Sequence, residues 1–278
     1  MFYCLHLRER EVGGAVVSGR LYRLLDEREV DWDARLPEFT AATRGGRLLV
    51  LLHGYNVSRS ERRARLSRYM RLLVAQGLTG PMLTVLWPGD GWAKALTYPF
   101  EGRDADDSAE ALWKWLVTHV HGQARIAFAG HSLGCRVAME TARRLARGGR
   151  LDLDRIVLMA PAIDNDSLGR SGRFGYRQAT LRAEQVAVLA SRQDRVLRFA
   201  YPLGDLAQTV LFGERWGRAL GYTGPVERDP EILSRLAPVP LAHPARNIDH
   251  GDYLGVAPGA DHAPAESERF VAPFLQHS

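Results

Sequence analysis

Residues 124–147 read ARIAFAGHSLGCRVAMETARRLAR, and this stretch decides the fold. It opens with a short apolar run over 125–129, which is typical of a buried strand. Gly130-His131-Ser132-Leu133-Gly134 follows directly. A helix is then predicted from apolar positions at helical spacing, which are Val137, Ala138, Thr141, Ala142 and Leu145. A G-x-S-x-G between a strand and a helix is the sequence context of a nucleophile elbow.

The two glycines of this motif have a steric reason. In such an elbow the strand and the helix come so close that the positions two residues either side of the serine must be small. Gly130 and Gly134 meet that need, so Ser132 is the candidate nucleophile. The motif is short enough to arise by chance. The rest of the chain must therefore supply a base, an acid and an oxyanion donor.

Outside this stretch, apolar strand patterns alternate with helix patterns, as in a parallel α/β sheet. We expect antiparallel edge strands near the N-terminus and buried strands later, and the predicted strands are 2–8, 15–25, 47–52, 82–87, 125–129, 155–160 and 185–190. Besides the elbow helix, the predicted helices are 58–75, 104–119 and 266–276. The length fits one α/β domain over 1–278, with an insertion at 198–245 that we interpret as a cap near the cleft.

The composition is that of an ordinary globular protein, with 46% hydrophobic and 25% charged residues. The net charge is +5, but the arginines are scattered among acidic residues, so we expect no nucleic-acid partner. No apolar run is long enough for a membrane span. The start, MFYCLHLRERE, lacks the apolar segment of a secretory signal. These features predict a cytoplasmic protein, and they do not indicate an oligomeric state.

Cofactor and metal motifs are missing from the sequence. It has only two cysteines, Cys4 and Cys135, which excludes a disulfide framework and fits a reducing compartment. It contains no H-E-x-x-H, no paired cysteines, no G-x-x-x-x-G-K-[ST] and no G-x-G-x-x-G. We therefore expect neither a metal nor a cofactor.

Two loops that follow predicted strands are candidates for the walls of a site. His53-Gly54-Tyr55-Asn56 follows the strand at 47–52, and in this type of fold such a loop supplies an oxyanion N–H, here that of Tyr55. The side chain of Asn56 is then placed to line the cleft. An ordinary turn with a glycine remains the alternative.

The second loop follows the strand at 82–87 and is unusually aromatic. Trp87 at the end of the strand and Trp92 and Tyr98 in the loop are the main aromatic residues. They form either an extra patch of core or the wall of a substrate pocket. We favour the pocket wall, because open α/β sheets bind ligands at the carboxyl ends of their strands.

The acid and the base must follow the nucleophile, in the order Ser, Asp, His. Asp194 lies after the strand at 185–190, and Asp164, after the preceding strand, is its competitor. His250 is the candidate base, and His243 and His262 are the alternatives. A turn aspartate that merely caps a helix is the structural explanation of Asp194 that remains open.

Taken in order, six segments resemble landmarks of the α/β-hydrolase superfamily: LLVLLHGYN, TVLWPGDG, FAGHSLGCRVA, LMAPAID, VLASRQDRVL and NIDHGDYLG. More narrowly, they look like its uncharacterised esterase- or lipase-like branch, which has a His-Gly-Tyr/Phe-Asn loop and a Trp-Pro after the next strand. The resemblance covers roughly 45–255.

The resemblance implies roles for individual residues. Ser132 would be the nucleophile, His250 the base and Asp194 the acid of a triad, with the N–H groups of Tyr55 and Leu133 as the oxyanion hole. The implied activity is hydrolysis of a small-molecule carboxylic ester through an acyl-enzyme. An acyltransferase, a thioesterase, a peptidase or a non-catalytic binding protein on the same scaffold is the alternative, because a fold alone does not decide function.

Overall fold

Parallel apolar strands form the centre of the sheet, and the candidate site lies at their carboxyl ends. The structure is a computed structural model that describes residues 1–10, 14–25, 28–54, 59–89, 98–172, 175–198, 218–240, 243, 246–254 and 267–276. For 59–62 and 98–102 it describes the backbone alone.

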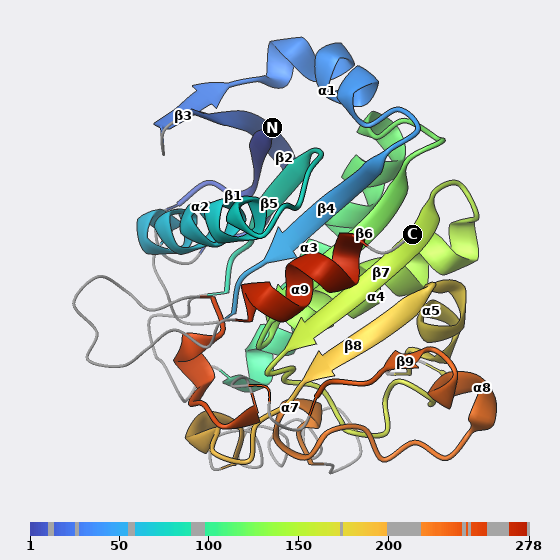
Figure 1. The fold of residues 1–278 in the computed structure, drawn as a ribbon. Coiled ribbons are helices and arrows are strands. Elements are labelled where there is room, and N and C mark those ends of the chain that lie inside the picture. The colour runs from blue at the N-terminus through green and yellow to red at the C-terminus, as the bar shows by residue number, and fades with distance from the viewer. Residues whose placement is uncertain are drawn as a thin grey trace.

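Over these residues, nine strands form one sheet in the order β3-β2-β1-β5-β4-β6-β7-β8-β9 (Figure 1). Their bounds are β1 Phe2–Arg8, β2 Val16–Leu25, β3 Arg28–Asp31, β4 Arg47–Leu52, β5 Met82–Leu86, β6 Arg125–His131, β7 Asp152–Met159, β8 Gln185–Leu189 and β9 Leu236–Ala237. Along this order, the neighbouring strands in β1-β5-β4-β6-β7-β8-β9 are all parallel. The remaining two pairs, β1–β2 and β2–β3, are antiparallel. The predicted fold class, a mostly parallel sheet with antiparallel N-terminal edge strands, is confirmed.

The described helices cover the sheet in two layers (Figure 1). Helices α2 (Arg59–Ala75) and α9 (Glu268–Gln276) contact each other on one side. Helices α3 (Tyr98–His119), α4 (Gly134–Gly148) and α5 (Arg177–Arg182) pack together on the other. Short helices complete the structure, namely α1 (Leu36–Ala42), α7 (Leu220–Thr223), α8 (Pro230–Leu233) and the 3₁₀ turns Asp33–Arg35 and His250–Asp252.

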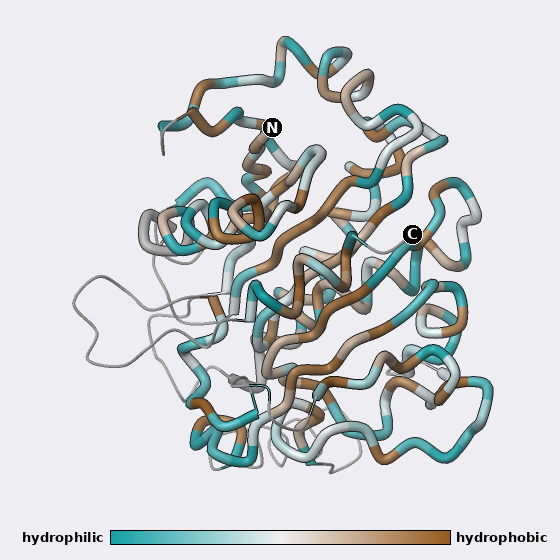
Figure 2. Tube along the Cα trace, in the orientation of Figure 1, coloured by the Kyte–Doolittle hydropathy of each residue, from teal (hydrophilic) through white to brown (hydrophobic). Residues whose placement is uncertain are grey.

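The central strands are apolar along nearly their whole length, as Figure 2 shows. Every residue of β5 is buried, and in β4 only Arg47 is partly exposed. Strands covered by helices on both faces lose the alternation of polar and apolar residues that a half-exposed strand has. This burial explains why the two segments are continuous apolar runs in the sequence.

One expectation about the elements was wrong. Helix α3 begins at Tyr98, so residues 98–103 are helical rather than part of a loop. Within the region 198–245, β9 pairs with β8 in parallel and extends the sheet, and the interpretation of this region as a cap stays a prediction. Within the described ranges, no helix combines the length and the apolar character that a membrane crossing requires.

Candidate functional site

The elbow around Ser132 has the tight geometry that its glycines predict. Ser132 directly follows β6 and has a φ of 54°, a left-handed conformation that is unusual for serine. A Cβ on Gly134 would lie 2.2 Å from the carbonyl oxygen of His53, and one on Gly130 would lie 2.9 Å from Cα of Cys135. Both contacts are with backbone, which does not give way easily. The two glycines therefore allow strand and helix to meet at the serine.

The first amide of the elbow helix is available at this turn. Leu133 is the N-cap residue of α4, and its N–H has no hydrogen-bond acceptor within the part of the chain that the structure describes. The N–H groups at a helix start lie at the positive end of the helix dipole. Such a donor beside the serine suits a developing negative charge on oxygen.

The structure brings the three predicted triad residues together. Nε2 of His250 lies 2.8 Å from Oγ of Ser132, and Nδ1 of His250 lies 2.7 Å from Oδ2 of Asp194. The Asp194 side chain is fully buried, while 14% of the His250 side chain is exposed. A carboxylate only accepts hydrogen bonds, so Nδ1–H donates to Asp194 and Nε2 is left to accept the proton of the serine hydroxyl.

Hydrogen bonds between two loops hold His250 and Asp194 in register. The backbone N–H of Leu197 donates to Oδ1 of Asp194 at 2.8 Å. Oγ of Ser191 donates to the carbonyl of Ile248 at 2.7 Å, which ties the loop of the acid to the loop of the base. The Oδ1 of Asp249 accepts from the N–H of His250 at 2.8 Å. The backbone of His250 and the carboxylate that its ring contacts are thus both held by hydrogen bonds.

The alternative acid and bases lie elsewhere or outside the described residues. Oδ2 of Asp164 accepts from Nη2 of Arg170 at 2.9 Å, on the loop after β7. The ring of His243 packs on Phe270, with 5.7 Å between centroids. His262 lies outside the described residues. The described geometry therefore favours Asp194 and His250.

His131, the variable residue of the motif, has a place that the sequence did not predict. Its Nε2–H donates to the backbone carbonyl of His250 at 2.7 Å. Its ring lies 5.0 Å from the ring of His250. Burial, with a smaller effect from His250, lowers the pKa of His131 to about 3, so the ring is neutral at ordinary pH. Its side chain therefore supports the base loop as an uncharged donor.

His53 and Trp87 brace the loop after β4. Nδ1–H of His53 donates to the carbonyl of Gly54 at 2.7 Å, and Nε2 accepts from the backbone N–H of Trp87 at 3.3 Å. The indole N–H of Trp87 donates to the carbonyl of His53 at 3.1 Å, and the two rings are stacked. Trp87 is 0% exposed, so its place is in the core, not in the pocket wall that we expected.

The other predicted pocket residues cannot be placed. Tyr55, Asn56 and Trp92 lie outside the described residues. Tyr98 begins α3, but its side chain lies outside them too. Among the described side chains, the group with ligand atoms for a metal is Cys4, His6 and Glu29, which comes from the edge strands and not from the elbow.

Comparison with known proteins shows the family of the chain. The family profile described as an alpha/beta hydrolase of unknown function (DUF900) matches residues 29–208. A search of curated proteins finds no match to the chain.

Several solved structures are similar in fold. Carboxyl esterase 2 from the mycorrhizal fungus Tuber melanosporum is 11% identical over 82% of this chain and 77% of that chain, with a TM-score of 0.46. An esterase from Pyrobaculum calidifontis is 16% identical over 82% and 76%, with a TM-score of 0.41. YbtT, a type II thioesterase of the yersiniabactin pathway, is 17% identical over 83% of this chain and 92% of that chain, with a TM-score of 0.38.

The family profile matches well over half of the length of this chain. The chain therefore belongs to the alpha/beta hydrolase family of unknown function that the profile describes.

Proposed function

We propose that this protein is a serine hydrolase that cleaves carboxylic esters of small molecules. One observation carries the proposal: Ser132, His250 and Asp194 form a continuous chain of hydrogen bonds at a strained elbow. A serine is a weak nucleophile on its own, and an adjacent base that a carboxylate orients is the usual way to activate it. A binding protein on this scaffold has no need for that arrangement.

The proposed reaction has two halves. Oγ of Ser132 attacks the ester carbonyl while Nε2 of His250 takes its proton and then passes it to the leaving alcohol. The product of this half is an acyl-enzyme on Ser132. Water, activated by the same imidazole, then attacks the acyl-enzyme and releases the acid. Asp194 keeps the proton on Nδ1 and stabilises the imidazolium that forms in each half.

The oxyanion hole and the pocket complete the proposal. The N–H of Leu133 and that of Tyr55 are the proposed oxyanion donors, and the loss of one such donor typically costs about 3 kcal/mol of transition-state stabilisation. Asn56, Trp92 and Tyr98 are the proposed substrate contacts. Both cysteines are free and buried, in keeping with the cytoplasmic location that we propose.

The test is covalent labelling with a fluorophosphonate, followed by turnover of a short nitrophenyl ester. The parent protein should be labelled, and Ser132→Ala should lose both the label and the turnover. Ser234→Ala is the matched control, because Ser234 is an exposed serine bonded to the carbonyl of Glu231. A Ser132→Ala protein that hydrolyses the ester at the parent rate would refute the proposal.

A substrate panel separates ester hydrolysis from other acyl transfers. Esters of increasing acyl length, thioesters and peptides would be compared, each with and without an added alcohol as acyl acceptor. We expect the highest kcat/KM for an ester with water as the acceptor. Faster turnover of a thioester or a peptide, or transfer to the alcohol, would keep the triad but change the substrate class.

A further inference from the structure

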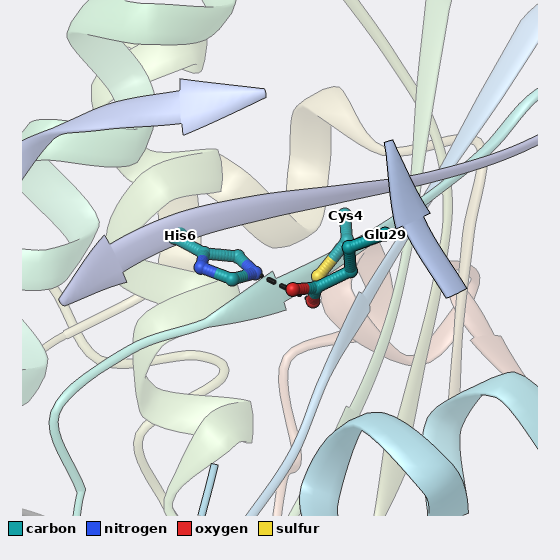
Figure 3. A group of neighbouring side chains, drawn as sticks. All are labelled: Cys4, His6 and Glu29. Atoms are coloured by element: carbon teal, nitrogen blue, oxygen red, sulfur yellow. Dashed lines mark hydrogen bonds and ion pairs between the residues drawn. The ribbon is translucent and has the colours of Figure 1, made fainter. Parts of the chain in front are cut away.

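A second cluster of reactive side chains lies at the N-terminal edge of the sheet, away from the elbow. Cys4 and His6 are two residues apart on β1, so their side chains lie on the same face of the strand. Glu29 reaches the same place from β3, beyond the intervening strand β2 (Figure 3). The proposed hydrolase mechanism does not use any of the three.

The ligand atoms of this cluster are close enough to share one ion. The Sγ of Cys4, a ring nitrogen of His6 and a carboxylate oxygen of Glu29 all lie within 4.8 Å of one another. Nε2 of His6 and Oε1 of Glu29 are 2.8 Å apart, and the dashed line in Figure 3 marks this contact. The ligands of an ion bound at about 2.0–2.3 Å lie at comparable separations.

We propose that Cys4, His6 and Glu29 bind a zinc ion. A thiolate, an imidazole and a carboxylate are the three kinds of ligand that zinc takes from proteins, whereas calcium and magnesium prefer oxygen alone. One thiolate and one carboxylate also balance the charge of a divalent ion. Water or a further protein group would complete the tetrahedron.

The surroundings of the cluster fit such a site. Cys4 is fully buried, and 5% of the His6 side chain and 11% of the Glu29 side chain are exposed. Nη1 of Arg63 lies 3.3 Å from Oε2 of Glu29, which is the carboxylate oxygen that His6 does not contact. A carboxylate that binds a metal is usually held in turn by an outer partner, and Arg63 is placed to hold Glu29 in this way. His6 also lines a cavity of about 390 Å³.

Zinc binding would replace the hydrogen bond between His6 and Glu29 with two bonds to the metal. The Cys4 thiol loses its proton to solvent and becomes the thiolate ligand, and the ring proton of His6 moves to Nδ1 so that Nε2 can bind. The ion would tie the four-residue strand β3 directly to β1.

The experiment uses the full-length protein, stripped with a chelator and then titrated with Co²⁺ and Zn²⁺. Cobalt in a site with one thiolate gives a sulfur-to-cobalt charge-transfer band that histidine and carboxylate ligands do not give. We expect one equivalent of Co²⁺ with this band, its displacement by Zn²⁺, and a higher unfolding temperature of the zinc-loaded protein.

Three variants decide the assignment. Cys4→Ser should lose the charge-transfer band, and Glu29→Gln should weaken zinc binding by about 10-fold or more, since it removes a charged ligand. Cys135→Ala removes the other cysteine of the chain and should keep the band. Circular dichroism of each metal-free variant shows whether it is folded. If Cys4→Ser does not fold, Glu29→Gln and the parent spectrum still decide.

Two outcomes would overturn the proposal. One is Co²⁺ binding to the parent protein without a charge-transfer band, which would place the ion on surface histidines. The other is a folded Glu29→Gln variant that binds zinc as tightly as the parent. Neither outcome depends on the proposed hydrolase activity, because neither measures turnover.

Discussion

At the scale of single residues, the proposed chemistry depends on which nitrogen of His250 carries the proton. Asp194 accepts a hydrogen bond from the backbone of Leu197 with one oxygen and faces Nδ1 of His250 with the other. Its carboxylate therefore holds the proton on Nδ1 and leaves Nε2 as the acceptor for Ser132. An amide at position 194 could donate to Nδ1 instead, which would favour the wrong tautomer.

We predict that Asp194→Asn lowers kcat for a nitrophenyl ester by about 10⁴-fold, because the tautomer that accepts the serine proton becomes rare. The control is Asp164→Asn, which removes the charge that pairs with Arg170 and does not involve His250. Asp164→Asn should keep kcat within about 2-fold of the parent, since the ion pair of its carboxylate is with Arg170 and includes none of Ser132, His250 or Asp194. If Asp164→Asn were the variant that loses turnover, the assignment of the acid would be reversed.

A second prediction concerns pH and His131. Its pKa is about 3 in the folded protein against an ordinary value of 6.5, so the unfolded chain binds a proton that the folded protein does not bind. Stability from this group is therefore complete above pH 6.5 and falls as the pH drops toward 3, by at most about 1.4 kcal/mol per pH unit.

Urea unfolding at several pH values between 7 and 4 measures this slope. His131→Gln keeps an N–H donor for the carbonyl of His250 but does not titrate, so its slope should be smaller than that of the parent. His121→Gln is the control, because His121 is partly exposed and its Nδ1 accepts from the N–H of Gln123. A parent slope that His131→Gln leaves unchanged would show that other groups cause the acid sensitivity.

The sequence was informative about the site where chemistry restricts the residue type and the order. Ser132 and Asp194 were selected because each follows a predicted strand, and His250 because it lies on a loop late in the chain, in the order that such a triad requires. The structure brings the three together. His131 was not selected, because the motif leaves its position open. Trp87 was misplaced, because an aromatic residue at a strand end has the same pattern whether it faces a pocket or supports a loop.

At the scale of elements, the close contact between α4 and the loop after β4 makes a sharp prediction. Gly134→Ala would put a Cβ 2.2 Å from the carbonyl of His53, so backbone must move and we expect a loss of about 3 kcal/mol of stability or more. Gly148→Ala, in the same helix, meets only Trp113 at 3.9 Å. It should gain about 0.5–1 kcal/mol, because alanine is the better helix former.

Denaturant unfolding of both variants tests this prediction, and ester turnover adds a second measurement. A displaced His53 loop should also reduce kcat in any Gly134→Ala protein that folds, while Gly148→Ala should retain the parent kcat. Equal stability of the two variants would mean that the elbow has more room than the structure shows.

The prediction of elements succeeded where an apolar pattern is long and failed where an element is short. Continuous apolar runs predicted β4 and β8 to within a residue, because buried parallel strands need them. Strands β3 and β9, with four and two residues, were missed. These two strands are defined by their pairing with a neighbouring strand. A segment that is so short and partly exposed has no apolar pattern from which such pairing could be predicted. The start of α3 was placed too late because the acidic residues from Asp104 onward suit a helix N-terminus. The helix in fact begins at Tyr98, with Pro99 in its first turn, where proline is tolerated.

At the scale of the whole molecule, the parallel sheet brings distant segments to one edge. Ser132 follows β6, the acid follows β8, and His250 comes from a loop more than fifty residues further on. Each lies where a strand or its following loop reaches the carboxyl edge, which is where open α/β sheets bind ligands. The site therefore depends on the integrity of the layers that hold the strands in place.

Helix α9 is part of one of the two helix layers that cover the sheet. Its removal tests whether the site depends on that layer. Val271, Ala272 and Leu275 are fully buried against the core, and the guanidinium of Arg155 in β7 lies over the ring of Phe274 at 5.2 Å. Deletion of residues 268–278 would expose this side of the sheet and of α2, at about 25 cal/mol for each Å² of apolar surface returned to water. We expect an insoluble or non-cooperatively unfolding protein without esterase activity, measured by soluble yield, thermal unfolding and turnover.

The control is deletion of residues 277–278 alone, which leaves α9 intact and should match the parent in all three measurements. A soluble 268–278 deletion that unfolds at the parent temperature would show that the sheet and the elbow do not need this layer.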